Sequence, residues 1–545
     1  MEQPTAIANH QVSARFWVLA AVVGLLLGGA AFWGANKRAL GLFHDDGIYT
    51  VVAKALSQGD GYRIISLPEA PPQTKYPFLY SYLLSWIWAL DSNFPQNIIF
   101  LKSLNVAILA AIFFVSIVFY RRYFPEAKFA ALIFALVVCT NPVIFTYTDY
   151  VISDLLFVML ALIALTIGAA HASASDPRFD VPLLALVTGL ACLTRLAAAP
   201  LVLAGGLYSF KRRGWRGVAY FIGVLALFLV PWFLWVSRAA FPSPDSLYAY
   251  YAAYDFGVAR AGDAAAWARQ LGIVAVGNAH HLAVSFEVLY LTPLLPGLYF
   301  LVIALSAIGM IASIRRAELV NWSFFLSSVA LLLIWPFHPG RYLGPLVAIL
   351  ILFLFRGMKT IEQWLESVSG EYPLARLGRK ISWCPTVLIL IVNGVWLSSY
   401  LLIQDNKTTR GVYGYRMSYA WSGFEESFAW IRQHTATDAL LATAYDPMYY
   451  LYTGRRAIRP ALHRSVTYFY PYGQARPDVG SVEVIKPQLD KLKVDYLVID
   501  PMDGYAEGNA TLRLFDGLVA AYGDRAKNVF TSMDGKHKIY ALAVD

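Results

Sequence analysis

The chain contains 545 residues, of which 58% are hydrophobic and only 14% are charged, and its formal net charge is +9. Soluble domains carry about 25% charged residues, so this composition excludes an ordinary water-soluble globule. The positive charge does not indicate a nucleic-acid partner. The basic residues lie in short loops between apolar blocks, where they set the orientation of membrane helices.

Apolar blocks long enough to cross a ~30 Å hydrocarbon core recur along the chain. The first covers residues 16–33, and we interpret it as a span rather than a cleaved signal peptide because only Arg15 precedes it as a positive charge. Together the blocks predict about eleven transmembrane helices, with a turn at Thr194–Arg195 between two short ones. The further blocks are residues 98–120, 129–147, 150–170, 182–195, 196–210, 218–236, 289–313, 321–336, 342–356 and 382–403.

The basic loops predict the orientation. With the N-terminus in the cytoplasm, the inside loops include the clusters at residues 121–128, 211–216, 315–316 and 356–380, as the positive-inside rule requires. We therefore expect a multi-pass protein of the plasma (inner) membrane, with residues 404–545 on the extracytoplasmic side.

Two segments between the predicted spans are long enough to have structure of their own. In residues 37–97, apolar residues recur at helical spacing over 48–56 and again over 80–88. This spacing predicts two short helices that lie in the membrane interface. The segment 237–288 is rich in aromatic residues, and we interpret its tyrosines at 248–254 as an interfacial belt.

Residues 404–545 lack a spanning apolar block, and helical patterns alternate there with short strand-like ones. This alternation predicts a small soluble α/β domain. The fold class is therefore mainly α, a membrane module of residues 1–403 followed by the α/β domain. The elements predicted in the domain are helices at 423–434 and 512–522 and strands at 440–445, 495–500 and 538–544.

Charged residues at the ends of the spans are the candidates for chemistry, because burying a charge in the membrane costs at least about 2.5 kcal/mol unless it has a partner. Under the predicted topology seven of them lie at the outside face. Three cations and four carboxylates together predict an anionic substrate handled beside a general base. We expect Asp149 to be only a solvated turn residue. The seven are Asp45, Asp46, Lys75, Asp149, Asp154, Arg195 and Arg341.

Five short segments resemble motifs of the GT-C glycosyltransferases, most closely the lipid A aminoarabinose transferases and the protein O-mannosyltransferases. In chain order they are HDDGIY from His44, KYPFLY from Lys75, SDLLF from Ser153, GLACLTR from Gly189 and GRYLGP from Gly340. The resemblance covers roughly residues 16–403. It departs from the family in the first motif, where many members have Asp-Glu in place of Asp-Asp.

The resemblance implies a hexosyl- or pentosyltransferase that moves a sugar from a polyprenyl monophosphate to a hydroxyl group, with inversion at the anomeric carbon. The acceptor would be a lipid, a glycan or a protein. The resemblance gives the role of general base to Asp45, which we expect to be partly solvated, with Asp46 and Asp154 orienting sugar or acceptor. It leaves open which carboxylate of the Asp45–Asp46 pair is the base, because many members have Asp-Glu at this position. Without a catalytic role, the pair would suit the N-cap of the following helix.

The cations would bind the departing phosphate. Lys75, Arg195 and Arg341 are the residues that the resemblance places there, because fixed positive charge stabilises an anion that forms in the transition state. Three tyrosines of the same motifs are further candidates for substrate binding: Tyr49, Tyr76 and Tyr342. No cofactor is expected, because His44 and His338 lack the spacing typical of a metal site, but a divalent metal stays open as an alternative.

Other functions stay open. A secondary transporter of an anionic substrate would place its ionisable residues near mid-span in broken helices, whereas here they gather at one end. An O-antigen ligase or polymerase would use a pyrophosphate-linked donor and arginines in one late outside loop. A non-catalytic sugar-binding or assembly protein would work through residues 404–545.

Overall fold

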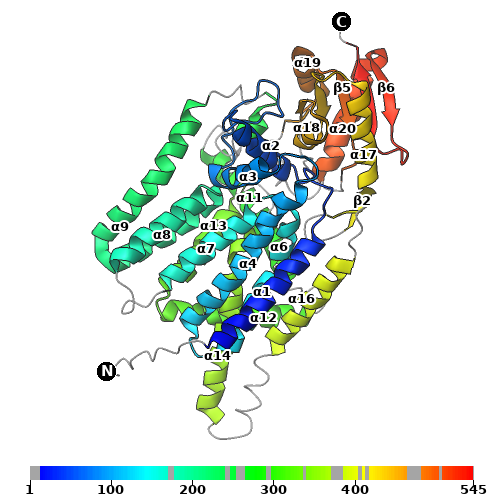
Figure 1. The fold of residues 1–545 in the computed structure, drawn as a ribbon. Helices are drawn as coiled ribbons and strands as arrows, with labels where there is room; N and C mark the ends of the chain where they lie inside the picture. Colours follow the sequence, from blue (N-terminus) through cyan, green and yellow to red (C-terminus); the bar gives the residue numbers. More distant parts are fainter. Residues whose placement is uncertain are drawn as a thin grey trace.

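A bundle of long helices carries a small α/β unit at one end (Figure 1). The unit comprises the described residues between 416 and 543, and we call the end of the bundle next to it the site end. The computed structural model describes residues 13–169, 177–239, 246–252, 264–289, 296–335, 339–369, 384–402, 408–410, 416–462, 480–502 and 506–543.

The elements follow one another in chain order. The helices are α1 (Ala14–Gly34), α2 (Asp45–Gln58), α3 (Phe78–Leu90), α4 (Ile98–Tyr123), α5 (Lys128–Cys139), α6 (Pro142–Thr146), η1 (Tyr147–Asp149), α7 (Asp154–Gly168), α8 (Pro177–Cys192), η2 (Leu196–Ala198), α9 (Ala199–Arg238), α10 (Ala249–Ala252), α11 (Ala264–Leu289), α12 (Pro296–Arg315), α13 (Leu319–Leu333), η5 (Pro339–Leu343), α14 (Gly344–Ser369), α16 (Cys384–Leu402), α17 (Trp421–His434), α18 (Asp446–Thr453), α19 (Val482–Leu492), α20 (Ala506–Tyr522) and η8 (Gly523–Arg525). The strands are β1 (Thr408–Arg410), β2 (Arg416–Ala420), β3 (Leu441–Thr443), β4 (Ala457–Ile458), β5 (Tyr496–Ile499), β6 (Ala526–Thr531) and β7 (Lys538–Leu542).

Several helices are suited to a membrane. Among the described residues, five are long and apolar enough to cross one, or six if the bent pair 128–139 and 142–149 is one span. Shorter apolar helices lie beside them, at residues 78–90, 154–168, 179–192, 299–315 and 319–333. The chain is therefore a multi-pass membrane protein, as the sequence predicts, while the number eleven stays a prediction.

Two breaks in the helices lie where the sequence predicts turns. Arg195 has an extended backbone (φ −152°, ψ 138°) between α8 and η2, which confirms the turn at Thr194–Arg195. Gly214 has φ +59° and ψ −150° and divides α9 into two arms, because only glycine adopts this conformation readily. These arms correspond to the predicted blocks 196–210 and 218–236.

The segment between α9 and α13 differs from the prediction. Helix α11 occupies the second half of the segment 237–288 and ends at Leu289. Helix α12 begins at Pro296, whereas we expected a span from residue 289. Asn278 of α11 donates from Nδ2 to the carbonyl oxygens of Leu332 (2.9 Å), Leu333 (3.2 Å) and Trp335 (2.8 Å). Helix α11 therefore packs against the site end of α13.

The first loop and the α/β unit have the predicted elements. Helices α2 and α3 form at the two amphipathic segments and pack against each other at the site end (Figure 1). In the described part of the α/β unit the sheet order is β4-β3-β5-β7-β6, with β3 parallel to β4 and β5 and with β7 antiparallel to β5 and β6. The sequence prediction misses the short helix α18, which proves important below.

The sequence led us to expect that Asp149 is a solvated turn residue. The structure shows that it is buried and paired with Lys102. Its Oδ1 lies 3.0 Å from Nζ of Lys102, and the two side chains are 7% and 2% exposed. The backbone N–H of Asn36 also donates to Asp149 Oδ1 (2.6 Å), and Lys102 donates to the Asn36 carbonyl oxygen (2.8 Å). This buried ion pair joins α4, η1 and the end of α1.

Breaking the pair is expected to destabilise the fold. Lys102→Met leaves a buried carboxylate without its cation, which typically lowers the free energy of unfolding by about 3–5 kcal/mol. Denaturant titration of the protein in detergent measures this loss. The double variant Lys102→Met, Asp149→Asn should lose less than the two single losses combined. A Lys102→Met protein with parent stability would show that the pair contributes nothing to the fold.

Candidate active site

Four separate segments bring charged side chains together at the site end. Asp45 is the first residue of α2, and Asp154 is the first residue of α7. A carboxylate in the first turn of a helix is stabilised by the helix dipole. Arg195 lies in the turn before η2, and Arg341 lies in η5 ahead of α14. We call these four residues the site cluster.

Arg341 bridges the two carboxylates. Its Nη2 and Nε donate to Asp154 Oδ2 (2.9 Å) and Oδ1 (3.2 Å), and its Nη1 donates to Asp45 Oδ2 (2.5 Å). Arg195 Nη1 donates to the same Asp154 Oδ2 (2.5 Å). The side chains of Asp45 and Arg341 are 15% exposed, and those of Asp154 and Arg195 only 6%. Asp45 and Arg341 are thus the more accessible members, although Asp45 is more deeply buried than we expected.

The three predicted tyrosines surround the site cluster. The Tyr76 hydroxyl donates to Asp45 Oδ1 (2.5 Å), which fixes the orientation of the carboxylate. The Tyr49 hydroxyl lies 2.8 Å from Oγ of Ser153, the residue that precedes Asp154. The guanidinium carbon of Arg195 lies 5.0 Å from the ring centroid of Tyr342.

Opposing effects set the pKa of Asp45. Burial raises it, but the positive charge of Arg341, the hydrogen bond from Tyr76 and the charge of Lys75 together lower the pKa to about 2. The carboxylate is therefore ionised and well placed to interact with cations. While Arg341 is bound to it, however, it is a weak base.

The Asp46 carboxylate binds backbone N–H groups of its own segment and not the arginines of the site cluster. Its Oδ2 accepts from the backbone N–H of Gly41 (2.9 Å), and its Oδ1 accepts from the N–H of Gly47 (2.9 Å). Burial raises the pKa of this carboxyl, against the lowering effect of these hydrogen bonds and of Lys102. Asp46 thus holds the backbone of the loop, and the geometry favours Asp45 over Asp46 as the base.

Lys75 lies near enough to Asp45 for its charge to lower the pKa of that carboxyl, and it is bound by a residue outside the predicted site. Its Nζ donates to the carbonyl oxygen of Tyr250 in α10 (2.9 Å) and lies 3.6 Å from the centroid of the Tyr250 ring. We interpreted the tyrosine run at 248–254 as an interfacial belt. Tyr250 belongs instead to the surroundings of the site.

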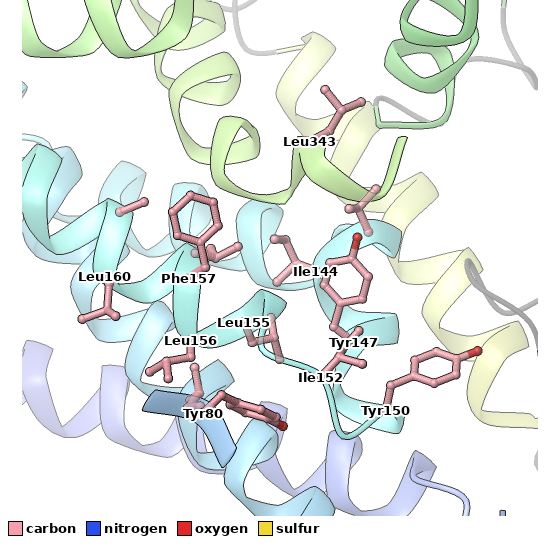
Figure 2. Close-up of a cluster of buried hydrophobic side chains, with 14 of the residues drawn as sticks. Tyr80, Ile144, Tyr147, Tyr150, Ile152, Leu155, Leu156, Phe157, Leu160 and Leu343 are labelled. Atoms are coloured by element: carbon pink, nitrogen blue, oxygen red, sulfur yellow. The ribbon is translucent and has the colours of Figure 1, made fainter. Parts of the chain in front are cut away.

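A buried apolar cluster includes residues next to members of the site cluster in the chain, such as Leu155 and Leu343. Figure 2 shows Ile144, Tyr147, Leu155 and Leu343 among its members, from α6, η1, α7 and η5. The Tyr147 hydroxyl donates to the carbonyl oxygen of Arg341 (2.6 Å). The apolar packing therefore fixes the backbone that carries Arg341.

His44, the first residue of the HDDGIY motif, pairs with a carboxylate of the α/β unit. His44 Nε2 lies 2.8 Å from Oδ1 of Asp446 in α18, and both side chains are buried. His338 lies outside the described residues. Among the described residues no group of three or more His, Cys, Asp and Glu side chains could hold a metal ion.

Comparison with known proteins supports this architecture. The sequence matches no family model and no curated protein. The structure of ArnT from Cupriavidus metallidurans bound to undecaprenyl phosphate is similar, with TM-score 0.54, 14% sequence identity and coverage of 97% of this chain and 98% of that chain. Archaeal oligosaccharyltransferase AglB from Archaeoglobus fulgidus, in complex with an inhibitory peptide and a dolichol-phosphate, gives TM-score 0.53 at 13% identity. This match covers 97% of this chain and 75% of the AglB chain. Both are GT-C glycosyltransferases.

This chain has the GT-C fold. The resemblance found in the five motifs is thereby confirmed at the level of architecture. In this chain, four of the motifs supply the site cluster, and the KYPFLY motif supplies Lys75 and Tyr76 beside it.

Proposed function

We propose that this GT-C chain transfers a sugar from a polyprenyl monophosphate to a hydroxyl of a lipid, glycan or protein, with inversion at the anomeric carbon. The bridge from Asp45 through Arg341 to Asp154 carries this proposal, because it joins a candidate base to a phosphate-binding guanidinium. The chain would then divide into a catalytic membrane module, residues 1–403, and a domain of residues 404–545.

The reaction needs one proton transfer and one substitution. Asp45 accepts the proton of the acceptor hydroxyl as its oxygen bonds to the anomeric carbon. The bond from that carbon to the phosphate oxygen breaks, and its electron pair stays on the departing phosphate. Arg341, Arg195 and Lys75 stabilise this charge in a site of low dielectric constant. Asp154 orients both guanidinium groups, since it is bound to each.

Donor binding would also prepare the base. The phosphate competes with Asp45 for Arg341, and an Asp45 released from Arg341 keeps its burial but loses the largest effect that lowers its pKa. Its pKa therefore rises from about 2 in the free enzyme once donor is bound. The same arginine then binds the donor and sets the strength of the base.

If the donor phosphate displaces Asp45 from Arg341, kcat and kcat/KM should depend on pH in different ways. Asp45 must be deprotonated to act, so activity falls as pH drops through its pKa. In kcat/KM, which reports the free enzyme, Asp45 should cause no loss in the usable range because its pKa is about 2. In kcat, which reports the donor complex, the acidic limb should lie at higher pH. Initial rates measured across pH test this, and coincident limbs would contradict this displacement.

We place the site end on the extracytoplasmic face of the plasma membrane. Basic residues at the opposite end of the bundle support this, among them Arg121 and Arg122 at the end of α4 and Arg315 at the end of α12. Protease added to intact spheroplasts should cleave residues 404–545 from the chain. Full protection of that segment would show that the proposed orientation is wrong.

Lipids that co-purify with the protein test the proposed function. We expect mass spectrometry of a lipid extract to detect a polyprenyl monophosphate, and Arg341→Ala to reduce its amount. A polyprenyl pyrophosphate would instead indicate a ligase or polymerase. Parent protein that neither retains a polyprenyl lipid nor transfers sugar from an added polyprenyl-phosphate donor would contradict the proposal.

A further inference from the structure

The backbone immediately before Asp45 is strained. His44 has φ +62° and ψ −56°, and the N–H of Asp45 donates to the carbonyl oxygen of Phe43 (2.8 Å). This is a γ-turn with positive φ, a rare conformation for a residue with a side chain. Such strain persists only where the surroundings impose it. Strain beside a reacting group therefore raises the question of what holds the turn.

The α/β unit holds it through the His44 ring. Nε2 of His44 lies 2.8 Å from Oδ1 of Asp446, a residue 402 positions away in the chain. The Asp446 side chain has no exposed surface, so it is fully buried where it meets the His44 ring. His44 Nδ1 is buried and has no hydrogen-bond partner among the described residues. Asp446 is thus the hydrogen-bonded anchor that the structure shows for this ring.

Close packing on both sides of the turn adds to this anchor. A Cβ atom at Gly41, which has φ +98°, would lie 2.6 Å from Cβ of Met448. A Cβ at Gly47 would lie 2.9 Å from Cβ of Pro447. Both contacts are to α18, so this helix fits directly against the backbone of residues 41–47.

The turn decides where the Asp45 carboxylate points. Asp45 reaches both Arg341 and Tyr76 at 2.5 Å, and those two partners lie on other segments of the membrane bundle. If His44 relaxed to a negative φ, the Cα–Cβ bond of Asp45 would be redirected, and the carboxylate would turn away from Tyr76 and from the space beside Arg341. Misplacement of a reacting group by about 1 Å can lower a rate about 100-fold.

We infer that His44 and Asp446 are positioning residues, through which the α/β unit holds the general base in its working geometry. This inference rests on the proposed function, because it assigns a catalytic effect to Asp45. It gives the α/β unit a part in the chemistry although none of its described residues belongs to the site cluster.

The first test removes the anchor. Asp446→Ala should lower kcat about 100-fold, because Asp45 is displaced, with a much smaller change in the KM for the donor. The matched control is His537→Ala, which removes a buried histidine–aspartate pair of the same unit, His537 Nδ1 to Asp500 Oδ1 at 2.8 Å, away from the turn. Rates are compared per folded enzyme. An Asp446→Ala enzyme with the kcat of the control overturns the inference.

The second test separates the anchor from the strain and does not depend on the stability of Asp446→Ala. Both His44→Ala and His44→Gly remove the imidazole, but glycine adopts φ +62° without strain. His44→Gly should therefore be the more active of the two, with a higher kcat at similar donor KM. Equal activities would overturn the inference. Failure of the proposed function is distinguishable, because the parent chain itself would then transfer no sugar.

Discussion

Replacing Asp45 with Asn is expected to lower turnover by about two to four orders of magnitude while donor binding is retained. The amide has nearly the shape of the carboxylate, and its oxygen can still accept the hydrogen bond from Tyr76. It cannot accept the proton of the acceptor hydroxyl at neutral pH. The loss should therefore appear in kcat, measured with a saturating polyprenyl-phosphate donor.

Asp46→Asn is the control for this result. Asp46 accepts hydrogen bonds from the N–H groups of Gly41 and Gly47, so its replacement should lower the thermal midpoint more than the turnover of the folded enzyme. If Asp46→Asn were inactive and Asp45→Asn active, Asp46 would be the general base and Asp45 would not. If both variants transfer sugar at the parent rate, the proposed glycosyltransferase mechanism is wrong.

The site cluster could be predicted from the sequence because its members stand at the ends of apolar segments. Asp154 and Arg195 each adjoin a helix whose place the hydropathy pattern gives, and the basic loops assign their ends to the same face. Helical periodicity likewise gave α2 and α3. These features depend on residues close together in the chain, and a single sequence contains that information.

Contacts between distant segments could not be predicted in this way. The partner of Asp149 is Lys102, a charge inside an apolar block, and only the folded bundle shows that the two meet. His44 and Asp446 are 402 residues apart, and Asp446 opens a helix too short to give a periodic pattern. The γ-turn at His44 is also invisible in the sequence, because histidine rarely has a positive φ.

Replacing Arg341 with Ala is expected to lower kcat by about 100- to 1,000-fold, the usual effect of removing one group that stabilises transition-state charge. Donor binding should weaken as well, since the guanidinium would meet the phosphate before the reaction. Arg341→Lys should recover only part of the activity. The arginine uses three nitrogens on two carboxylates, and one ammonium group cannot reproduce that fork.

Arg356→Ala is the matched control, because Arg356 lies further along α14 and pairs with Glu318 at 2.6 Å, with a side chain only 5% exposed. Its loss should lower stability but leave the kinetics of the folded enzyme unchanged.

Arg341→Ala also has a consequence for pH. With the arginine gone, burial of Asp45 acts against fewer lowering effects, and its pKa rises from about 2. A base with a higher pKa becomes protonated at higher pH, so kcat/KM should gain an acidic limb in the measurable range in Arg341→Ala, whereas Arg356→Ala should keep the parent profile. If Arg341→Ala kept the parent rate and profile, Arg341 would be only an anchor at the membrane edge.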